Sequence, residues 1–211
     1  ENSDGLSVLS VSYPPDDSAL IWHVHSQSAR DVRVTIRYRL RGFNKDVSYV
    51  GTVNADETAM TLRENVYLFN HSGEDFLPGW IGLGDGNWRK LRWAAGETKR
   101  LSVYRVRDIP LEKTYTYDVR ELDRDPDEIR RTEQVAVHYR FANGADHNLG
   151  DRALRSGKLR LYQEGPDGES VFTGEDQLSY SPVGDSISVH IGASRDVNVR
   201  QNTVRRERIN V

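Results

Sequence analysis

The segment Asp31–Gly42 reads DVRVTIRYRLRG, and it indicates the fold class more clearly than any other stretch of the chain. Apolar side chains occupy every second position, and arginine or threonine fills the positions between them. The apolar members are Val32, Val34, Ile36, Tyr38 and Leu40. A period of two residues sends successive side chains to opposite faces of a strand and fits no helical stripe. The segment is therefore predicted to be a strand with one buried and one solvated face.

The same alternation recurs along the chain between turn residues. Strands are expected around residues 20–25, 101–103, 115–117, 135–141, 159–163, 170–173 and 187–191. Gly165-Pro166-Asp167-Gly168 separates two of them, and it is typical of a hairpin turn because proline presets φ and glycine accepts a positive φ. Short connections of this kind favour antiparallel neighbours. The chain is thus predicted to be all-β, an antiparallel β-sandwich.

The domain organisation follows from the same pass along the chain. Residues 1–211 are expected to form a single β-rich unit, with a weak boundary near Pro110 that would divide it into packed sub-lobes 1–110 and 111–211. Two stretches interrupt the alternation. Gly79–Gly96 holds three tryptophans among five glycines and is predicted to be a long loop or a distorted edge, and the polar stretch Asp123–Glu128 is predicted to be an exposed loop.

Composition excludes several classes of function. The chain has 29 Lys and Arg against 32 Asp and Glu, a net charge of −3. A general nucleic-acid binder needs a basic excess to displace counterions from phosphates, so no nucleic-acid partner is expected. There is no cysteine, which excludes disulfides, thiolate metal sites and cysteine nucleophiles. No apolar run approaches the roughly 18 residues that a membrane span requires.

Two groups of residues are candidate binding sites. Trp80, Trp88 and Trp93 would offer an aromatic platform to a sugar ring or to the apolar surface of a partner, although burial as anchors under a long loop is the favoured explanation of the same residues. Arg33, Arg37 and Arg39, together with Arg41, would present cations along about 20 Å of strand to an acidic polymer or to membrane headgroups. A soluble outer face that discourages edge pairing explains the same row.

Metal and enzymatic signatures are incomplete. His23 and His25 would share one face of a strand, as metal ligands do, but no third ligand is placed by the sequence. Asp123–Glu128 has oxygen ligands for calcium but lacks the glycine and the distal glutamate of an EF-hand. Gly82–Gly86 does not complete a phosphate-binding glycine motif. No metal site, no cofactor and no catalytic residue is therefore predicted.

Several short motifs also follow one another in a recognisable order. They are NHSGEDF at 70–76, YRVRDIPLEK at 104–113, GKLRLYQ at 157–163, FTGEDQL at 172–178, SPVGD at 181–185 and IGASRDV at 191–197. In this order they resemble the C-terminal domain of unknown function of mucoidy-inhibitor-like bacterial proteins, over roughly residues 30–205. The chain departs from that family at Gly42-Phe43-Asn44-Lys45, where a tryptophan-containing turn is usual. The resemblance implies a β-rich module of the bacterial cell envelope, hence an extracytoplasmic location, and no catalytic residues.

The leading hypothesis is a non-catalytic interaction or structural module, which binds a protein partner or a second copy of itself through strand edges or the tryptophan-rich stretch. The first alternative is a carbohydrate-binding module that uses Trp80, Trp88 or Trp93. The second is a hydrolase with a pair of catalytic carboxylates, whose separation the sequence does not give.

Overall fold

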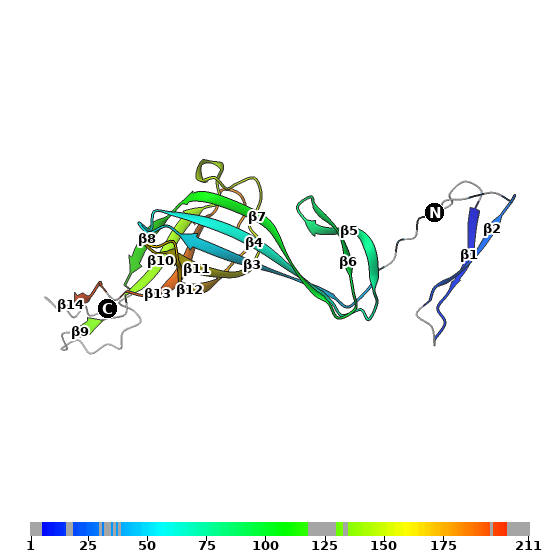
Figure 1. Ribbon diagram of the computed structural model, residues 1–211, viewed down its shortest axis with the longest axis horizontal. Coiled ribbons are helices and arrows are strands. Elements are labelled where there is room, and N and C mark those ends of the chain that lie inside the picture. The colour runs from blue at the N-terminus through cyan, green and yellow to red at the C-terminus, as the bar shows by residue number, and fades with distance from the viewer. Residues whose placement is uncertain are drawn as a thin grey trace, which may run out of the picture. The chain divides into compact units, whose positions relative to one another are not determined.

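The computed structural model describes residues 6–15, 19–29, 31, 35, 37, 39–117, 130–132, 135–194 and 196–201 (Figure 1). They belong to two compact units, residues 1–39 and 40–211. The described residues form fourteen strands and one short 3-10 helix, η2 (Ala145–His147), with no α-helix among them. The all-β prediction is confirmed. The sub-lobe boundary near Pro110 stays a prediction.

The described part of the first unit contains one antiparallel hairpin. It pairs β1 (Leu6–Ser12), which was not predicted, with β2 (Ile21–Ser26), the strand expected around residues 20–25. Val8 lies directly opposite Val24, and about half the surface of each is exposed, 48% and 49%. The hairpin therefore buries little of its apolar face within its own two strands.

The strand predicted over Asp31–Gly42 is not found in the described residues. Val32, Arg33, Val34, Ile36 and Tyr38 lie outside them. The described members of the segment, including Arg37, Arg39 and Leu40, belong to no strand, and the next strand begins at Phe43. An alternating pattern shows which faces a strand would have, but a strand also needs a neighbour that accepts its backbone hydrogen bonds. The described members of this segment have no such neighbour.

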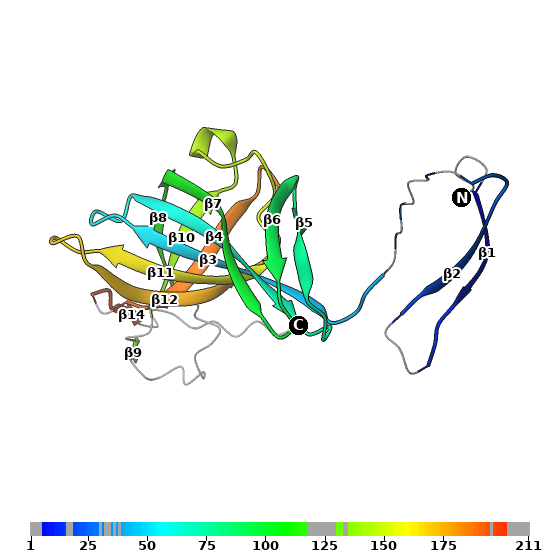
Figure 2. The ribbon, with the colours of Figure 1, turned by 45° about the vertical axis from the view of Figure 1, so that its right-hand side comes forward.

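The second unit is built on a five-stranded sheet (Figure 2). Its strands, in spatial order, are β12 (Ser170–Leu178), β11 (Gly157–Glu164), β3 (Phe43–Val53), β4 (Ala59–Asn70) and β7 (Thr98–Pro110). The predicted turn Gly165–Gly168 joins β11 to β12 and is confirmed. A fully antiparallel sheet is wrong, because β11 pairs with β3 in parallel. Turn signals report only on strands that are neighbours in sequence, and these two are more than a hundred residues apart.

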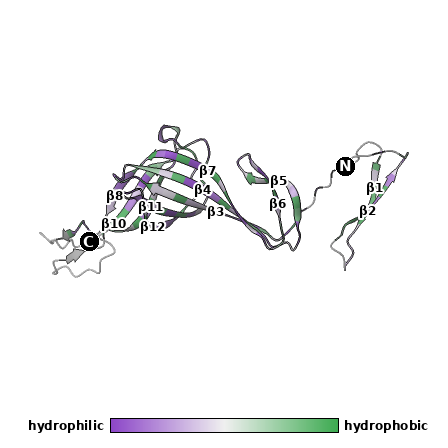
Figure 3. Cartoon of the chain, viewed as in Figure 1, coloured by the Kyte–Doolittle hydropathy of each residue, from purple (hydrophilic) through white to green (hydrophobic). Residues whose placement is uncertain are grey.

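The remaining strands of the second unit form smaller sheets. They are the three-stranded sheet β13 (Ser186–Ala193), β10 (Ala136–Ala142) and β8 (Glu112–Thr116), the hairpin β5 (Phe76–Gly84) with β6 (Asn87–Trp93), and the short pair β9 (Arg130–Thr132) with β14 (Val199–Gln201). Hydrophobic and hydrophilic residues alternate most clearly along β10, β11 and β13 (Figure 3).

One apolar core takes side chains from both the five-stranded and the three-stranded sheet. Tyr49 and Leu62 reach it from β3 and β4, Leu159 from β11, and Tyr139 and Val189 from β10 and β13. Each of them is almost completely buried. At the usual value of about 25 cal/mol per Å² of apolar surface, burial of this kind is the main stabilising contribution to the unit.

An ion pair connects the turn between β3 and β4 to the three-stranded sheet. The Glu57 carboxylate accepts hydrogen bonds from Lys113 Nζ at 2.7 Å and from the Tyr139 hydroxyl at 2.6 Å. Burial acts to raise the pKa of Glu57, but the hydrogen bonds from Lys113 and Tyr139 outweigh it and hold that pKa below its ordinary value. The ionised carboxylate is thus the form that links the turn to β8 and β10.

Replacing Tyr139 with phenylalanine is expected to lower the free energy of unfolding by about 2 kcal/mol, because a hydrogen bond to a charged group is lost. The lowered pKa of Glu57 means that its contribution is present above the ordinary glutamate pKa and is lost as pH falls through the folded value. The difference in the free energy of unfolding between the wild type and Tyr139→Phe should therefore become smaller at acidic pH. Urea unfolding at pH 7 and pH 3 measures it, and Tyr162→Phe, which removes a hydroxyl from a half-buried ring, is the control. A Tyr139→Phe deficit no larger than the control's contradicts this role.

Candidate binding surface

The tryptophan-rich stretch, predicted to be a long loop or a distorted edge, forms a hairpin with two register shifts, so the long-loop alternative is wrong. β5 and β6 pair from Phe76 opposite Trp93 to Gly84 opposite Asn87. The two residues between the strands, Asp85 and Gly86, both have positive φ, 49° and 73°. Two positive φ values are what a two-residue hairpin turn with the correct twist requires, and Asp-Gly is a preferred pair for it. The sequence therefore contained the turn signal, which the surrounding glycines obscured.

One face of this hairpin is buried. Leu83 and Trp93 belong to a second apolar cluster with Val66 and Leu68 of β4, and Ile81 and Leu91 pack against it. Trp93 is only 5% exposed, and its indole nitrogen donates a hydrogen bond to the Glu97 carbonyl oxygen at 3.0 Å. Trp93 is thus a core residue and does not lie with the two other candidate tryptophans.

The other face of the hairpin exposes Trp80 and Trp88, at 68% and 58%. Trp80 lies opposite Lys90 and Gly82 opposite Trp88, so the two indoles lie on one face and on neighbouring rows. A Cβ atom at Gly82 would be 3.2 Å from the Trp88 ring, so the absence of a side chain there leaves room for the indole. Exposed cationic residues follow along β6, namely Arg89, Lys90 and Arg92. Trp80, Trp88, Lys90 and Arg92 are called the hairpin surface below.

Arg155 holds the tip of the hairpin against the rest of the unit, and Lys45 Nζ adds a hydrogen bond to the Leu83 carbonyl oxygen at 3.3 Å. Arg155 donates from Nη1 to the Leu83 carbonyl oxygen at 2.7 Å and from Nε to the Asp85 carboxylate at 2.9 Å. Its own backbone is fixed by Tyr49, whose hydroxyl accepts from the Arg155 amide at 2.9 Å and donates to the Arg155 carbonyl at 3.0 Å. The hairpin surface is therefore tied to β3 and to the Arg155 backbone by hydrogen bonds.

The same guanidinium lies near a buried carboxylate. Glu64 of β4 has a side chain only 3% exposed, and its Oε1 is 3.8 Å from Arg155 Nη2 with no hydrogen-bond partner in the described chain. Burial raises the pKa of Glu64 and outweighs the opposing charges of Arg155 and Arg152. Burial also raises the pKa of the Tyr49 hydroxyl, and the charge of Glu64 raises it further. Arg155 thus compensates the charge of Glu64 when the carboxyl group is ionised.

The predicted cation row does not form a strand in the described chain. Arg33 lies outside the described residues, and Arg37 and Arg39 are exposed and belong to no strand. His23 and His25 share a face of β2, as predicted. The structure also places the rings of His138 and His190 5.2 Å apart across β10 and β13. Within the described ranges, no three metal-ligating side chains gather at one point. Asp123–Glu128 lies outside those ranges.

Sequence reasoning found the exposed tryptophans but not the residues that hold them. Arg155, Asp85 and Glu64 are far apart in the chain, and no local pattern links them. The residues that the structure describes include no helix with the length and apolar character of a membrane span. Comparison with known proteins finds no protein-family model, no curated protein and no solved structure that matches this chain.

Proposed function

We propose that the chain is a non-catalytic interaction module that binds an acidic protein partner through the hairpin surface. The observation that carries the proposal is a pair of exposed tryptophans on a hairpin whose reverse face is part of the core. Two large apolar side chains held in water on a packed hairpin are typical of binding anchors, because tryptophan is strongly enriched among the residues that dominate interface energies.

The charge of the surface selects the chemistry of the partner. Lys90 lies opposite Trp80, Arg92 is exposed two residues further along β6, and the nearest acid on the hairpin, Asp85, is already bound by Arg155. Cations at the rim of an apolar patch steer association towards acidic groups and disfavour basic ones. The expected partner surface therefore has an apolar pocket or side chain flanked by carboxylates.

Two pairs of carboxylates bear on the hydrolase alternative. Glu64 and Asp85 both contact the Arg155 guanidinium, but the Glu64 side chain is only 3% exposed, which leaves little room for a substrate to reach it. Asp108 and Glu164 line a common pocket, but they stand on β7 and β11. These strands are separated by β4 and β3, which puts the two backbones about 14 Å apart at the usual strand spacing. Glycosidase pairs need carboxyl groups about 5–9.5 Å apart.

The fold and the location belong to the same proposal. We propose that the five-stranded and three-stranded sheets pack face to face as a sandwich, which the shared apolar core supports. The motif order that resembles the mucoidy-inhibitor-like domain supports a place in the bacterial cell envelope.

The test is selection of a random peptide library on the wild-type protein. Enriched peptides are expected to combine Asp or Glu with a large apolar residue. Calorimetry should then show that Trp80→Ala or Trp88→Ala lowers the affinity for the selected peptide by about 30-fold, as expected for an interface anchor. Binding should also weaken as salt is added. Phe172→Ala removes another exposed ring, 54% accessible on β12, and should leave the affinity unchanged.

The outcomes separate the candidate functions. Peptides without acidic residues, or equal affinity for the wild type and both tryptophan variants, contradict the proposal. Exposed indoles are also the feature on which sugar-binding modules rely. Indole fluorescence that responds to oligosaccharides, and loses the response in Trp80→Ala, would instead establish the carbohydrate-binding alternative. A wild-type dimer in sedimentation that the tryptophan variants abolish would show self-association.

A further inference from the structure

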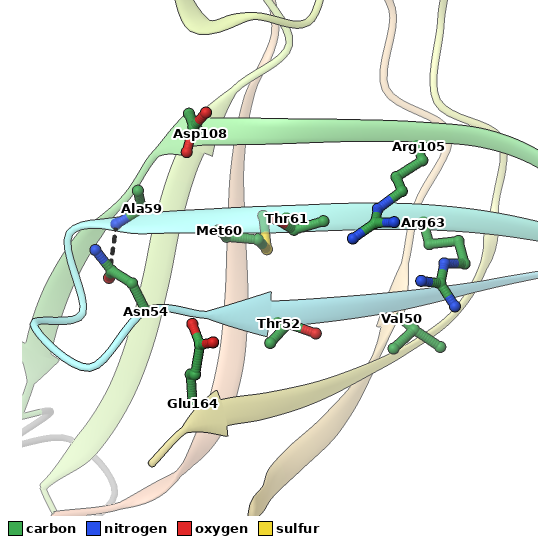
Figure 4. A pocket seen from close by; sticks show the side chains of 10 residues that line it. All are labelled: Val50, Thr52, Asn54, Ala59, Met60, Thr61, Arg63, Arg105, Asp108 and Glu164. Atoms are coloured by element: carbon green, nitrogen blue, oxygen red, sulfur yellow. Dashed lines mark hydrogen bonds between the residues drawn. The ribbon is translucent and has the colours of Figure 1, made fainter. Parts of the chain in front are cut away.

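A pocket lies on the outer face of the five-stranded sheet, the face opposite the core. It has a volume of about 280 Å³. Short side chains form its floor, because Val50 and Thr52 of β3 and Thr61 of β4 alternate with the core-facing residues of these strands. Longer charged side chains stand around this floor (Figure 4). The hollow therefore follows from the choice of residue sizes on one sheet face.

Two arginines stand at one end of this pocket. Arg63 of β4 and Arg105 of β7 are directly opposite each other in the strand register. Like charges at such positions destabilise a sheet. The next cation in the same cross-sheet row, Arg160, is paired with Glu175 at 3.3 Å, whereas neither Arg63 nor Arg105 has a salt bridge to any described residue. The pair thus leaves two guanidinium forks available to an oxyanion.

Two carboxylates stand at the other end. Glu164 is the last residue of β11 and Asp108 lies on β7, and both side chains line the pocket. Asp108 has a positive φ of 56° where β7 shifts register against β4, and its carbonyl oxygen is held by Asn148 Nδ2 at 2.7 Å. Neither carboxylate has a salt bridge within the part of the chain that the structure describes. Figure 4 shows the arginines over one end of the strands and the acids over the other.

We infer that this pocket binds a short zwitterionic peptide, with its carboxylate between Arg63 and Arg105 and its ammonium group at Glu164. A ligand of one charge sign would be repelled at one end, whereas a dipolar ligand is attracted at both. The arginine row and the Glu164 row are four residues apart, about 13 Å along the strands. An extended chain covers about 3.3–3.6 Å per residue, so three residues cover most of this span and the long side chains the remainder.

Titration of the isotope-labelled protein with trialanine tests the inference on the wild type. Amide resonances of Thr52, Thr61 and Arg63 should shift, with a dissociation constant that rises as salt is added. N-acetyl-trialanine and trialanine amide each lack one terminal charge, and each should bind at least about tenfold more weakly. No shift at millimolar trialanine, or equal binding of the capped peptides, overturns the inference without reliance on any variant.

Variants then assign the two ends. Arg63→Gln and Arg105→Gln should each lower the affinity for trialanine about tenfold or more. The melting temperature should stay unchanged or rise, because each substitution removes a contact between like charges. Glu164→Gln should weaken trialanine and leave its acetylated form unaffected. Arg100→Gln is the control. Arg100 lies on β7, as Arg105 does, but it stacks on Tyr67 and lines no part of this pocket, so its replacement should leave the affinity for trialanine unchanged. Equal affinities for Arg63→Gln and Arg100→Gln would overturn the assignment.

Discussion

Replacing Arg155 with methionine is expected to lower the free energy of unfolding by about 3–5 kcal/mol, the cost of leaving a buried charge without its partner. The methionine keeps most of the apolar volume but removes the guanidinium 3.8 Å from Glu64, whose side chain is only 3% exposed. It also removes the hydrogen bonds to Leu83 and Asp85 that hold the hairpin tip. The hairpin surface should lose its fixed position even in the molecules that stay folded.

The pH dependence of this variant identifies the cause of the loss. The pKa of Glu64 is raised in the folded state, so the folded state binds the extra proton. Its contribution to stability is therefore present below the ordinary glutamate pKa and is lost as pH rises through the folded value. Without Arg155 the folded value rises further. The deficit of Arg155→Met should thus be largest at neutral pH and smaller near pH 4.5, as urea unfolding at both values would show.

Two further variants control this prediction. Adding Glu64→Gln to Arg155→Met should restore much of the stability, because the buried group is then neutral. Arg160→Met removes an arginine whose ion pair with Glu175 is about half exposed on both sides, and exposed pairs contribute only about 0–1 kcal/mol. A loss in Arg155→Met that is no larger than in Arg160→Met, or that is the same at all pH values, would show that Glu64 is not the group responsible.

Replacing Gly157 with alanine is expected to lower the free energy of unfolding by about 3 kcal/mol. A Cβ atom there would lie 2.4 Å from the Val47 carbonyl oxygen and 2.9 Å from the carbonyl carbon. Both are backbone atoms of β3, so neither can turn aside as a side chain does. The parallel pair of β11 and β3 has to move apart at its first residues, with loss of hydrogen bonds and of packing around Tyr49.

Gly79→Ala is the matched control for this substitution. Gly79 is also a strand glycine without a positive φ, but the nearest atom to its added Cβ is the Leu77 carbonyl oxygen at 3.6 Å, an ordinary contact. Thermal unfolding of the two variants should show a large loss for Gly157→Ala and little change for Gly79→Ala. Equal losses would mean that the cost arises from the alanine itself and not from the approach of β11 to β3.

Local patterns predicted the parts of the fold that local interactions determine. The alternation of Val137, Tyr139 and Phe141 correctly predicted which side of β10 enters the core, and Gly165–Gly168 correctly predicted the turn between β11 and β12. Over Asp31–Gly42 the described residues belong to no strand, since alternation alone does not say whether a neighbouring strand is present. Alternation failed for the parallel pair because only contacts between distant segments place β11 beside β3.

For the candidate sites too, the sequence predicts local features but not those that depend on contacts between distant segments. Two of the three tryptophans proved to be exposed, but only the pairing of β5 with β6 shows that Trp93 faces inward while Trp80 and Trp88 face outward. The pair Arg63 and Arg105 could not be recognised, since 42 positions separate residues that are adjacent only through the register of β4 and β7. A site formed by side chains of neighbouring strands can be identified only when the strand register is known.

The parallel pairing also orders events during synthesis on the ribosome. β4 can join β3 as soon as both have left the exit tunnel, but the other edge of β3 has no neighbour until β11 is made, more than a hundred residues later. At about 5–20 residues per second, that edge stays open for several seconds, and an open edge invites pairing with other chains. Slower translation lengthens the time for which that edge is open, and it should therefore increase aggregation of the nascent chain.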